Sequence, residues 1–203
     1  MKIFSVVALI TGLVALAAST FGQGYEVGDT VSDFKLKNVD GKMVSLSDFK
    51  RSTGVIVIFD CNTCPYSKAY NDRIIALNSK YASKGFPVVT INSNDAESSP
   101  GDSFEQMVSK ARKKKYDFPY LWDDTQKVGR AFGATNTPHA FVLKRQGSDF
   151  VVAYIGAIDN NARNASLADK KYVEDAVNAL LSDKPVPVEK TKAVGCGIWW
   201  KDA

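Results

Sequence analysis

The feature that most constrains the fold of this chain is a cysteine pair placed directly after an apolar run. Residues 55–59 read Val-Ile-Val-Ile-Phe, which is typical of a strand buried on both faces of a sheet. The motif Cys-Asn-Thr-Cys follows at residues 61–64 and opens an amphipathic stretch from Ser67 to about Tyr81. The sequence therefore predicts a strand that delivers two thiols onto the first turn of a helix. Unpaired backbone amides and the helix dipole stabilise a thiolate there, which indicates a redox site.

The start of the chain has the pattern of a secretory signal peptide. Lys2 is followed by an almost wholly apolar segment over residues 3–18 and by small residues up to Gly22. The apolar part is too short for a stable membrane span, and removal of residues 1–22 would leave enough chain for one domain. We therefore expect a signal peptide over 1–22, one domain over 23–184 and a C-terminal tail over 185–203, packed on the domain. The predicted location is periplasmic or secreted.

The charge balance is weakly basic, with 26 Lys and Arg against 22 Asp and Glu. This excess is too small and too scattered to favour nucleic acid as a partner. The densest basic run, residues 110–115, is typical of a solvated helix face. We expect contact with a membrane only through the export signal.

Three cysteines are too few for a scaffold held together by disulfides. An exported protein of this size with a Cys-x-x-Cys motif is more readily explained as one that handles disulfides in other proteins. Cys196 lies in the tail, between two glycines and shortly before Trp199 and Trp200. Two interpretations stay open: a small buried hydrophobic residue, or a third redox thiol that the tail brings to the cysteine pair.

The remaining pattern alternates strands and helices, which predicts an α/β domain. Segments 31–36 and 43–46 are expected to form an N-terminal hairpin, and segment 88–91 to form a strand parallel to 55–59. Residues 92–117 insert a loop and a helix, which either shape a partner groove or decorate the surface. The later elements expected are helices over about 103–115, 126–132 and 169–182, and a hairpin formed by 140–143 and 151–155.

Three segments carry a resemblance to a known group. They are Phe59–Tyr66, Asn136–His139 and Tyr154–Asp159, and their order and spacing resemble the thioredoxin superfamily. More narrowly, the chain from about residue 26 resembles exported bacterial redoxins of the AhpC/TSA and thioredoxin-like group. The resemblance implies a thioredoxin-like fold, with a central mixed sheet flanked by helices, an N-terminal β extension, a helical insertion and a C-terminal tail.

By position, the resemblance implies that Cys61 is the attacking thiol, Cys64 the resolving thiol and Pro138 a cis-proline beside them. Cys61 lies nearest the helix end and is expected to be the more exposed and more acidic thiol. Asp60 opposes this, because its negative charge disfavours a neighbouring thiolate. The implied activity is thiol–disulfide exchange with protein thiols and disulfides and with a thiol electron donor, without a metal or other cofactor.

The same resemblance implies where a substrate would bind. A cis bond at Pro138 would turn the backbone of Thr137 toward the sulfurs and leave its peptide groups free to pair with a bound chain. The expected substrate-binding residues are Thr137, Asn62, Thr63 and Pro65. The chain departs from the thioredoxin pattern, since it has no Trp directly before the first cysteine and no acidic residue within 55–59.

Alternative chemistries stay open. A thiol peroxidase would use Cys64 to attack the peroxide and Cys61 as its resolver, although the places where peroxiredoxins carry a Thr and an Arg hold Cys61 and His139 here. A copper-handling protein would use both thiols and His139, and a zinc site would add Cys196. His139 is otherwise a packed or surface histidine. Pro65 stands where covalent haem attachment needs a histidine, which excludes that chemistry.

Overall fold

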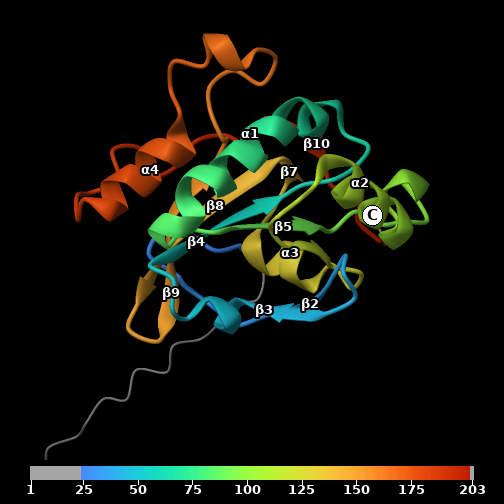
Figure 1. Ribbon diagram of the computed structural model, residues 1–203, viewed down its shortest axis with the longest axis horizontal. Helices are drawn as coiled ribbons and strands as arrows, with labels where there is room; N and C mark the ends of the chain where they lie inside the picture. The colour runs from blue at the N-terminus through green and yellow to red at the C-terminus, as the bar shows by residue number, and fades with distance from the viewer. Residues whose placement is uncertain (1–23, 202–203) are drawn as a thin grey trace, which may run out of the picture.

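The computed structural model describes residues 24–201, so the predicted signal peptide lies outside the described residues. Its centre is an eight-stranded mixed sheet with the order β1-β9-β8-β4-β5-β6-β2-β3 (Figure 1). Strands β4 (Gly54–Phe59), β5 (Val88–Asn92) and β6 (Tyr120–Trp122) run parallel. The hairpin of β8 (His139–Gln146) and β9 (Asp149–Gly156) lies antiparallel on the other side of β4. The expectation of an α/β fold around a mixed sheet is confirmed.

The N-terminal extension is divided between the two edges of the sheet. Strand β1 (Thr30–Val31) pairs with β9, whereas β2 (Lys35–Asn38) and β3 (Met43–Ser45) form an antiparallel hairpin beside β6. The predicted hairpin is therefore present, but its first strand begins later than expected. Val31 is buried at one edge and Leu36 at the other, so the segment between them has to cross the sheet.

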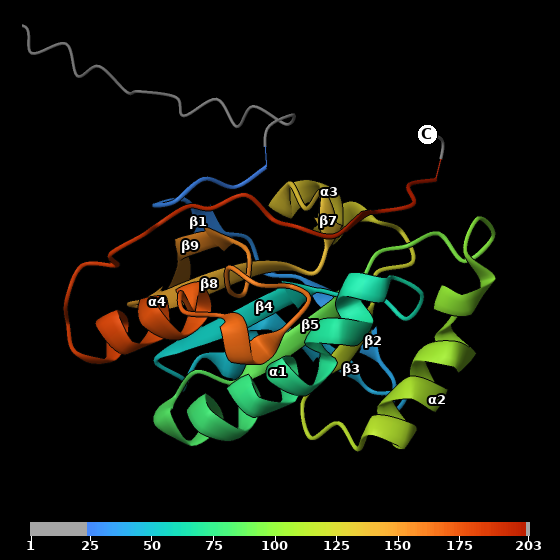
Figure 2. The ribbon, with the colours of Figure 1, turned by 90° about the horizontal axis from the view of Figure 1, so that it is seen from above.

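Helices cover both faces of the sheet. Helices α1 (Pro65–Tyr81) and α4 (Tyr172–Leu181) lie on one face, and α3 (Lys127–Phe132) lies on the other together with the C-terminal tail (Figure 2). Helix α2 (Phe104–Lys114) packs beside β6. Short 3-10 turns cover Leu46–Phe49, Ala82–Lys84, Pro100–Asp102 and Ala165–Leu167.

The apolar run in β4 explains why this strand is central. Val55, Val57 and Phe59 belong to the core on the α3 side, and Ile56 and Ile58 belong to the core under α1 and α4. Every residue of the strand is buried, as expected for a strand covered on both faces. The strand, α1 and the parallel strand β5 form the predicted βαβ unit, which fixes the start of α1 at the end of β4.

One pair of short strands lies outside the central sheet. Strands β7 (Asn136–Thr137) and β10 (Cys196–Gly197) form a separate two-stranded sheet.

Among residues 24–201, no helix has both the length and the apolar character that crossing a membrane requires. Sequence reasoning missed β6, because three residues are too few to give a period.

Phe132 is the aromatic centre of the core on the α3 side, and it generates a stability prediction. Its ring contacts the rings of Tyr25, Phe34, Phe59 and Phe141 at centroid distances of 5.1 to 6.1 Å. Phe132→Ala is expected to lower the free energy of unfolding by about 3–5 kcal/mol, because it leaves a cavity among those rings. Urea denaturation of fully reduced protein measures the change. Met43→Ala, at an exposed position, is the control, and an equal effect of both substitutions would contradict the prediction.

Candidate active site

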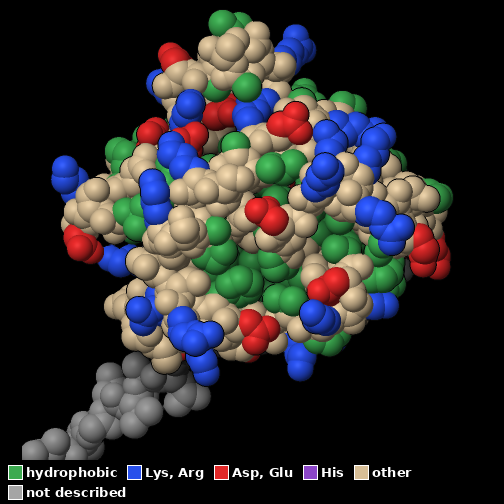
Figure 3. Space-filling model, in the orientation of Figure 1, with side chains coloured by type: hydrophobic (Ala, Val, Ile, Leu, Met, Phe, Trp, Pro, Cys, Tyr) green, Lys and Arg blue, Asp and Glu red, His purple; other side chains and the backbone are tan. Residues whose placement is uncertain are grey.

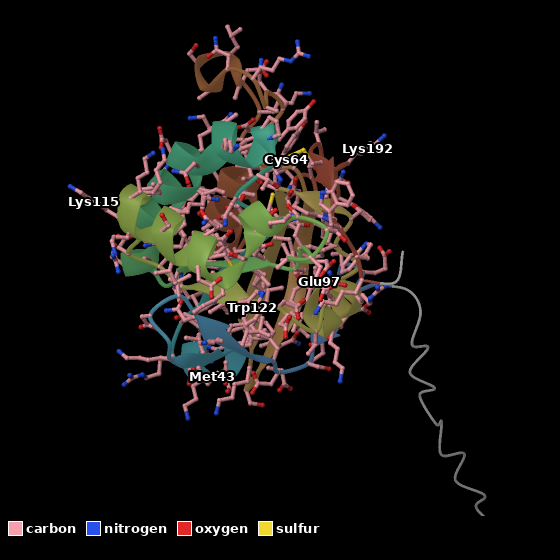
Figure 4. All side chains as sticks on the ribbon, turned by 90° about the vertical axis from the view of Figure 1, so that its right-hand side faces the viewer. Met43, Cys64, Glu97, Lys115, Trp122 and Lys192 are labelled. Carbon is pink, nitrogen blue, oxygen red and sulfur yellow. A yellow bond between two sulfur atoms is a disulfide. The ribbon has the colours of Figure 1, made fainter. Side chains whose placement is uncertain are left out.

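The cysteine loop joins β4 to α1. Cys64 is the N-cap of α1 and Pro65 its first residue, a position that suits proline because no helical partner is needed for its missing amide. Cys61 lies one turn earlier, and its Sγ is 3.4 Å from the backbone N of Cys64 and 3.1 Å from Oγ1 of Thr137. Both sulfurs therefore lie at the start of α1, as the sequence predicted. Cys64 is labelled in Figure 4.

The disulfide in this structure joins Cys64 to Cys196, with their Cα atoms 5.9 Å apart. Cys61 is a free and buried thiol. The tail thus brings the third cysteine to the Cys-x-x-Cys site, which favours the second of the two interpretations of Cys196. The structure shows no bond between Cys61 and Cys64, so the pairing within the motif is not the one present here.

Strand β10 brings Cys196 to the site by pairing with β7. The pairing is antiparallel, with Cys196 opposite Thr137 and Gly197 opposite Asn136. The Sγ of Cys64 lies 3.1 Å from the carbonyl oxygen of Thr137. The peptide bond between Thr137 and Pro138 is cis. The structure therefore gathers Thr137, Pro138, Pro65 and all three cysteines at one place.

Asp102 holds the two residues between the cysteines. Its carboxylate accepts the backbone N–H of Asn62 at 2.5 Å and the hydroxyl of Thr63 at 2.7 Å. Ser99 and Asn94 donate to the same carboxylate at 2.7 and 2.9 Å. Burial acts to raise the pKa of Asp102, but these hydrogen bonds outweigh it and leave that pKa below its ordinary value. Asp102 therefore remains charged and fixes the conformation of the loop.

A second buried acid adjoins Cys61. Asp60 is fully buried, and its Oδ2 accepts a hydrogen bond from Nζ of Lys110 at 2.7 Å. Lys110 also donates to the carbonyl oxygen of Cys61 at 2.8 Å. The prediction that residues 110–115 form a solvated face is therefore wrong for Lys110, whose side chain is only 13% exposed. The inserted helix α2 turns this lysine inward because a buried carboxylate without a cation would be costly.

The expectation that Cys61 is the more exposed of the two thiols is wrong for this state, because Cys61 is 1% exposed and Cys64 is 3% exposed. Burial raises the pKa of Cys61, and the charges of Asp60 and Asp102 raise it further. Hydrogen bonds from Thr137 and from the backbone of Cys64 act in the opposite direction without outweighing the rise. In this oxidised state Cys61 is a buried thiol kept protonated at neutral pH.

His139 lies near the site but faces other groups. Its Nδ1 accepts the backbone N–H of Thr135 at 3.3 Å, and its ring packs against Phe141 with centroids 4.7 Å apart. Burial lowers the pKa of His139 to about 4. His139 is thus a packed, neutral histidine, the plainer of its two interpretations. Among residues 24–201, no group of three or more His, Cys, Asp or Glu side chains has an arrangement that suits a metal ion.

The surface next to the cysteine loop is hollowed and positively charged. Figure 3 shows Lys and Arg side chains gathered over α2. A hollow of about 440 Å³ lies between α1 and α2. The loop residues Asn62 and Thr63 line one side of it, and its charged lining consists of Lys68, Lys110, Lys113 and Lys114. The inserted segment 92–117 therefore forms a wall of the site as well as part of the surface.

The residues that sequence reasoning missed all come from this insertion or from its contacts. Asp102 and Lys110 were passed over because their partners lie about forty and fifty residues away in the chain. Tyr120 was also missed, and its hydroxyl donates to Oδ1 of Asn62 at 2.9 Å. The one available signal was Asp60, a charged residue at the end of an apolar strand, which suggests a buried partner.

This fold and this arrangement of cysteines define a thioredoxin-like redox protein. The AhpC/TSA family model matches residues 27–155, and the chain belongs to the AhpC/TSA family. It is 25% identical over 157 residues to the thiol-disulfide oxidoreductase ResA of Bacillus thuringiensis subsp. konkukian (strain 97-27), covering 71% of this chain and 83% of that protein. It is 31% identical over 141 residues to the chloroplastic peroxiredoxin Q of Triticum aestivum, covering 63% of this chain and 57% of that protein.

Solved structures agree on the fold. An uncharacterized conserved protein from Geobacillus kaustophilus superposes with a TM-score of 0.81 at 35% identity, covering 95% of this chain and all of that one. A putative thiol:disulfide interchange protein DsbE from Chlorobium tepidum superposes with a TM-score of 0.56 at 24% identity, covering 77% of this chain and 98% of that one. The second similarity bears on the fold alone, and it supports the thioredoxin-like architecture.

The charge next to Cys61 gives a first prediction for the site. Asp60→Asn is expected to lower the pKa of Cys61, because it removes a negative charge that disfavours the thiolate and leaves Lys110 unpaired beside it. Since Cys64 and Cys196 are bonded in oxidised protein, the pH dependence of alkylation by iodoacetamide reports Cys61 alone. Asp124→Asn, an exposed position paired with Lys201, is the control. An unchanged or raised pKa in the Asp60 variant would contradict the prediction.

The single histidine of the chain gives a second prediction. An unfolded histidine titrates near 6.5 and folded His139 near 4, so the unfolded state binds more protons between these pH values. The contribution of His139 to stability is therefore complete above pH 6.5 and is lost as the pH falls toward 4, by about 3 kcal/mol. The imidazole resonances of the folded protein, followed by NMR, are expected to titrate with a midpoint near 4. A midpoint near 6.5 would contradict the prediction.

Proposed function

We propose that this protein is an exported thiol–disulfide oxidoreductase that exchanges electrons between protein disulfides and a thiol donor through Cys61, Cys64 and Cys196. The observation that carries the proposal is a free thiol, Cys61, placed one helical turn from a disulfide between Cys64 and a cysteine of the tail. Three sulfurs at one helix start permit exchange without any other cofactor. Export rests on the predicted signal peptide over 1–22.

The geometry favours Cys64 as the attacking sulfur, the reverse of the order that the resemblance implies. Cys64 is the residue bonded to the tail, so a chain that occupies the place of the tail meets the sulfur of Cys64 first. As the N-cap of α1, Cys64 also lies at the positive end of the helix dipole, although its sulfur accepts no hydrogen bond from the first turn. Both cysteines are buried in this oxidised form, and the pKa of Cys61 is raised. A buried thiol next to the attacking cysteine suits the resolving role.

In the proposed cycle, the Cys64 thiolate of reduced protein attacks a substrate disulfide, forms a mixed disulfide and releases one substrate thiolate. Cys61, as a thiolate, then attacks the Cys64 sulfur, which forms a Cys61–Cys64 disulfide and releases the second substrate thiolate. The substrate has gained two electrons and the protein has lost them. Attack of Cys196 on Cys64 then frees Cys61 and gives the disulfide described above, with no further redox change. A donor dithiol reduces that disulfide and closes the cycle.

The residues around the sulfurs have supporting roles in this proposal. Thr137 offers its backbone to the bound chain, and Pro138 and Pro65 border the place where the two chains meet. Asn62 and Thr63 keep the loop in one conformation through their hydrogen bonds to Asp102, so that the loop does not have to reorganise as disulfides exchange. Protein disulfides are the substrate class that the family and the ResA-like relative favour.

A second candidate function is supported by the same disulfide. A thiol peroxidase would use Cys64 to attack a peroxide, which leaves as water or an alcohol and converts Cys64 to a sulfenic acid. Condensation with the Cys196 thiol would release water and give the Cys64–Cys196 bond. The similarity to peroxiredoxin Q favours this reading. Against it, the hydrogen bonds of the described residues bring no arginine to Cys64 to stabilise charge on the peroxide.

Variants that keep a single cysteine distinguish thiol–disulfide exchange from peroxidase activity. We expect Cys61→Ser/Cys196→Ser protein, which keeps Cys64, to form a stable mixed disulfide with a protein disulfide substrate such as insulin. The matched Cys64→Ser/Cys196→Ser protein, which keeps Cys61, is expected to react at least about tenfold more slowly, because the pKa of its thiol is raised. Mass spectrometry of the trapped adducts measures both rates.

Other outcomes of the trapping experiment would indicate a different attacking cysteine or a different reaction. Faster trapping on Cys61 would restore the order that the resemblance implies. If neither protein traps a disulfide but the protein with Cys64 alone is oxidised rapidly by hydrogen peroxide, the peroxidase is the function. Cys196→Ser is the control for the tail, since it retains both cysteines of the motif and is expected to complete a first turnover and stop as a Cys61–Cys64 disulfide.

A further inference from the structure

We infer that residues 195–198 are a built-in copy of the substrate chain, and that the site selects cysteines preceded by a glycine and followed at the second position by an aliphatic residue. The inference rests on the proposed function and specifies its substrate. It follows from the way the tail lies in the site.

The tail binds as an added strand. Cys196 and Gly197 pair antiparallel with Thr137 and Asn136. The pairing continues beyond them, since the backbone N of Ile198 donates to the carbonyl oxygen of Thr135 at 3.2 Å. In strand addition, backbone hydrogen bonds give affinity and the alternating side chains give specificity. A chain of any sequence could make these backbone bonds, so selection has to come from the side chains.

Gly195 occupies a position with no room for a side chain. A methyl group added there would lie 2.1 Å from the carbonyl oxygen of Thr137 and 2.6 Å from its carbonyl carbon. These are backbone atoms of the strand that the tail pairs with, so they cannot move aside without disturbing the pairing. The amide of Asn136 also donates to the carbonyl oxygen of Gly195 at 3.0 Å. The residue before the cysteine is therefore restricted to glycine.

The two positions after the cysteine differ from each other. A methyl group added at Gly197 would meet no atom within 4 Å, so this position accepts other residues. Ile198 is 8% exposed and belongs to the core cluster that contains Phe132 and Phe59. An aliphatic side chain here gains the burial of its apolar surface, and a charged one would have to be desolvated. The pattern read from the tail is glycine, cysteine, any residue, aliphatic residue.

The tail also has to leave before a substrate can bind. The bond between Cys64 and Cys196 holds it in place in oxidised protein. Attack of the Cys61 thiolate on the Cys64 sulfur forms Cys61–Cys64, breaks the bond to the tail and releases Cys196 as a thiolate, so electrons are conserved within the chain. Reduction by the donor also breaks the covalent link to the tail, and it leaves Cys64 as a free thiol. In reduced protein a chain of the same pattern can then compete with the tail for the strand position.

Peptides test the selection directly. Full-length reduced protein is mixed with the glutathione mixed disulfide of Ala-Val-Gly-Cys-Gly-Ile-Trp, and release of glutathione in the first turnover gives a second-order rate constant. Valine in place of the glycine before the cysteine, or aspartate in place of the isoleucine, is expected to lower this constant about tenfold or more. Valine in place of the glycine after the cysteine is the matched control, with a change of less than about twofold.

The tail itself provides a test that does not depend on turnover. Gly195→Ala is expected to shift the Cys64–Cys196 equilibrium in glutathione buffers toward the dithiol by about tenfold or more, because the methyl group collides with Thr137. Gly197→Ala, with open space, is the matched control and is expected to leave the equilibrium unchanged. Mass spectrometry after thiol alkylation measures both.

The outcomes separate this inference from the proposed function. Equal rates for all four peptides, or equal equilibria for the two glycine variants, would overturn the selection and leave thiol–disulfide exchange in place. If neither the peptides nor protein disulfides such as insulin react with reduced protein, the proposed function fails, and this inference fails with it.

Discussion

The arrangement of the site depends on one buried carboxylate. Asp102 accepts hydrogen bonds from the loop between the two cysteines and from Asn94 of the insertion. Asn94 in turn accepts the backbone N–H of Trp199 at 3.0 Å. A single charged group therefore connects the cysteine loop, the inserted segment and the tail. Because an unpaired buried carboxylate is costly, the cysteine loop and the inserted segment stabilise each other through Asp102.

The inserted segment 92–117 therefore has a structural role that its sequence does not indicate. Polar residues such as Ser99 and Asn94 are typical of an exposed loop, yet both side chains are buried against Asp102. Lys110 has the same character, since it lies in a basic run but pairs with buried Asp60. The insertion thus carries the electrostatics of the site: one acid fixes the loop, and one lysine compensates the acid beside Cys61.

The parts of the structure that sequence reasoning predicted are those determined by neighbours in the chain. The apolar run of β4, the cysteine pair and the helix after it follow from residues 54–81 alone, and the parallel strand β5 follows from the βαβ rule. The order of the sheet edges and the partners of Asp102 and Lys110 could not be predicted, because they depend on contacts between distant segments. The position of Cys196 falls between these cases. Its flanking glycines indicated close backbone approach, but not which cysteine it would meet.

The two acids near Cys61 also give the two thiols of the motif different electrostatic surroundings. Cys61 is buried near Asp60 and Asp102, which disfavour its thiolate. Cys64 is the N-cap of α1, where the helix dipole favours a thiolate. In the order of attack that we propose, the acids of the insertion and of the end of β4 therefore disfavour Cys61 as the first thiol to react.

The bond between Cys64 and Cys196 spans 132 residues of the sequence. In the chain-entropy account, closing a loop of this length lowers the conformational entropy of the unfolded state. This raises the free energy of unfolding by about 5 kcal/mol. The oxidised and reduced forms of the protein therefore differ in the stability of most of the domain as well as in the state of two sulfurs. The protein is therefore most resistant to unfolding and to proteolysis in its oxidised form, and it unfolds most readily once the Cys64–Cys196 bond is reduced.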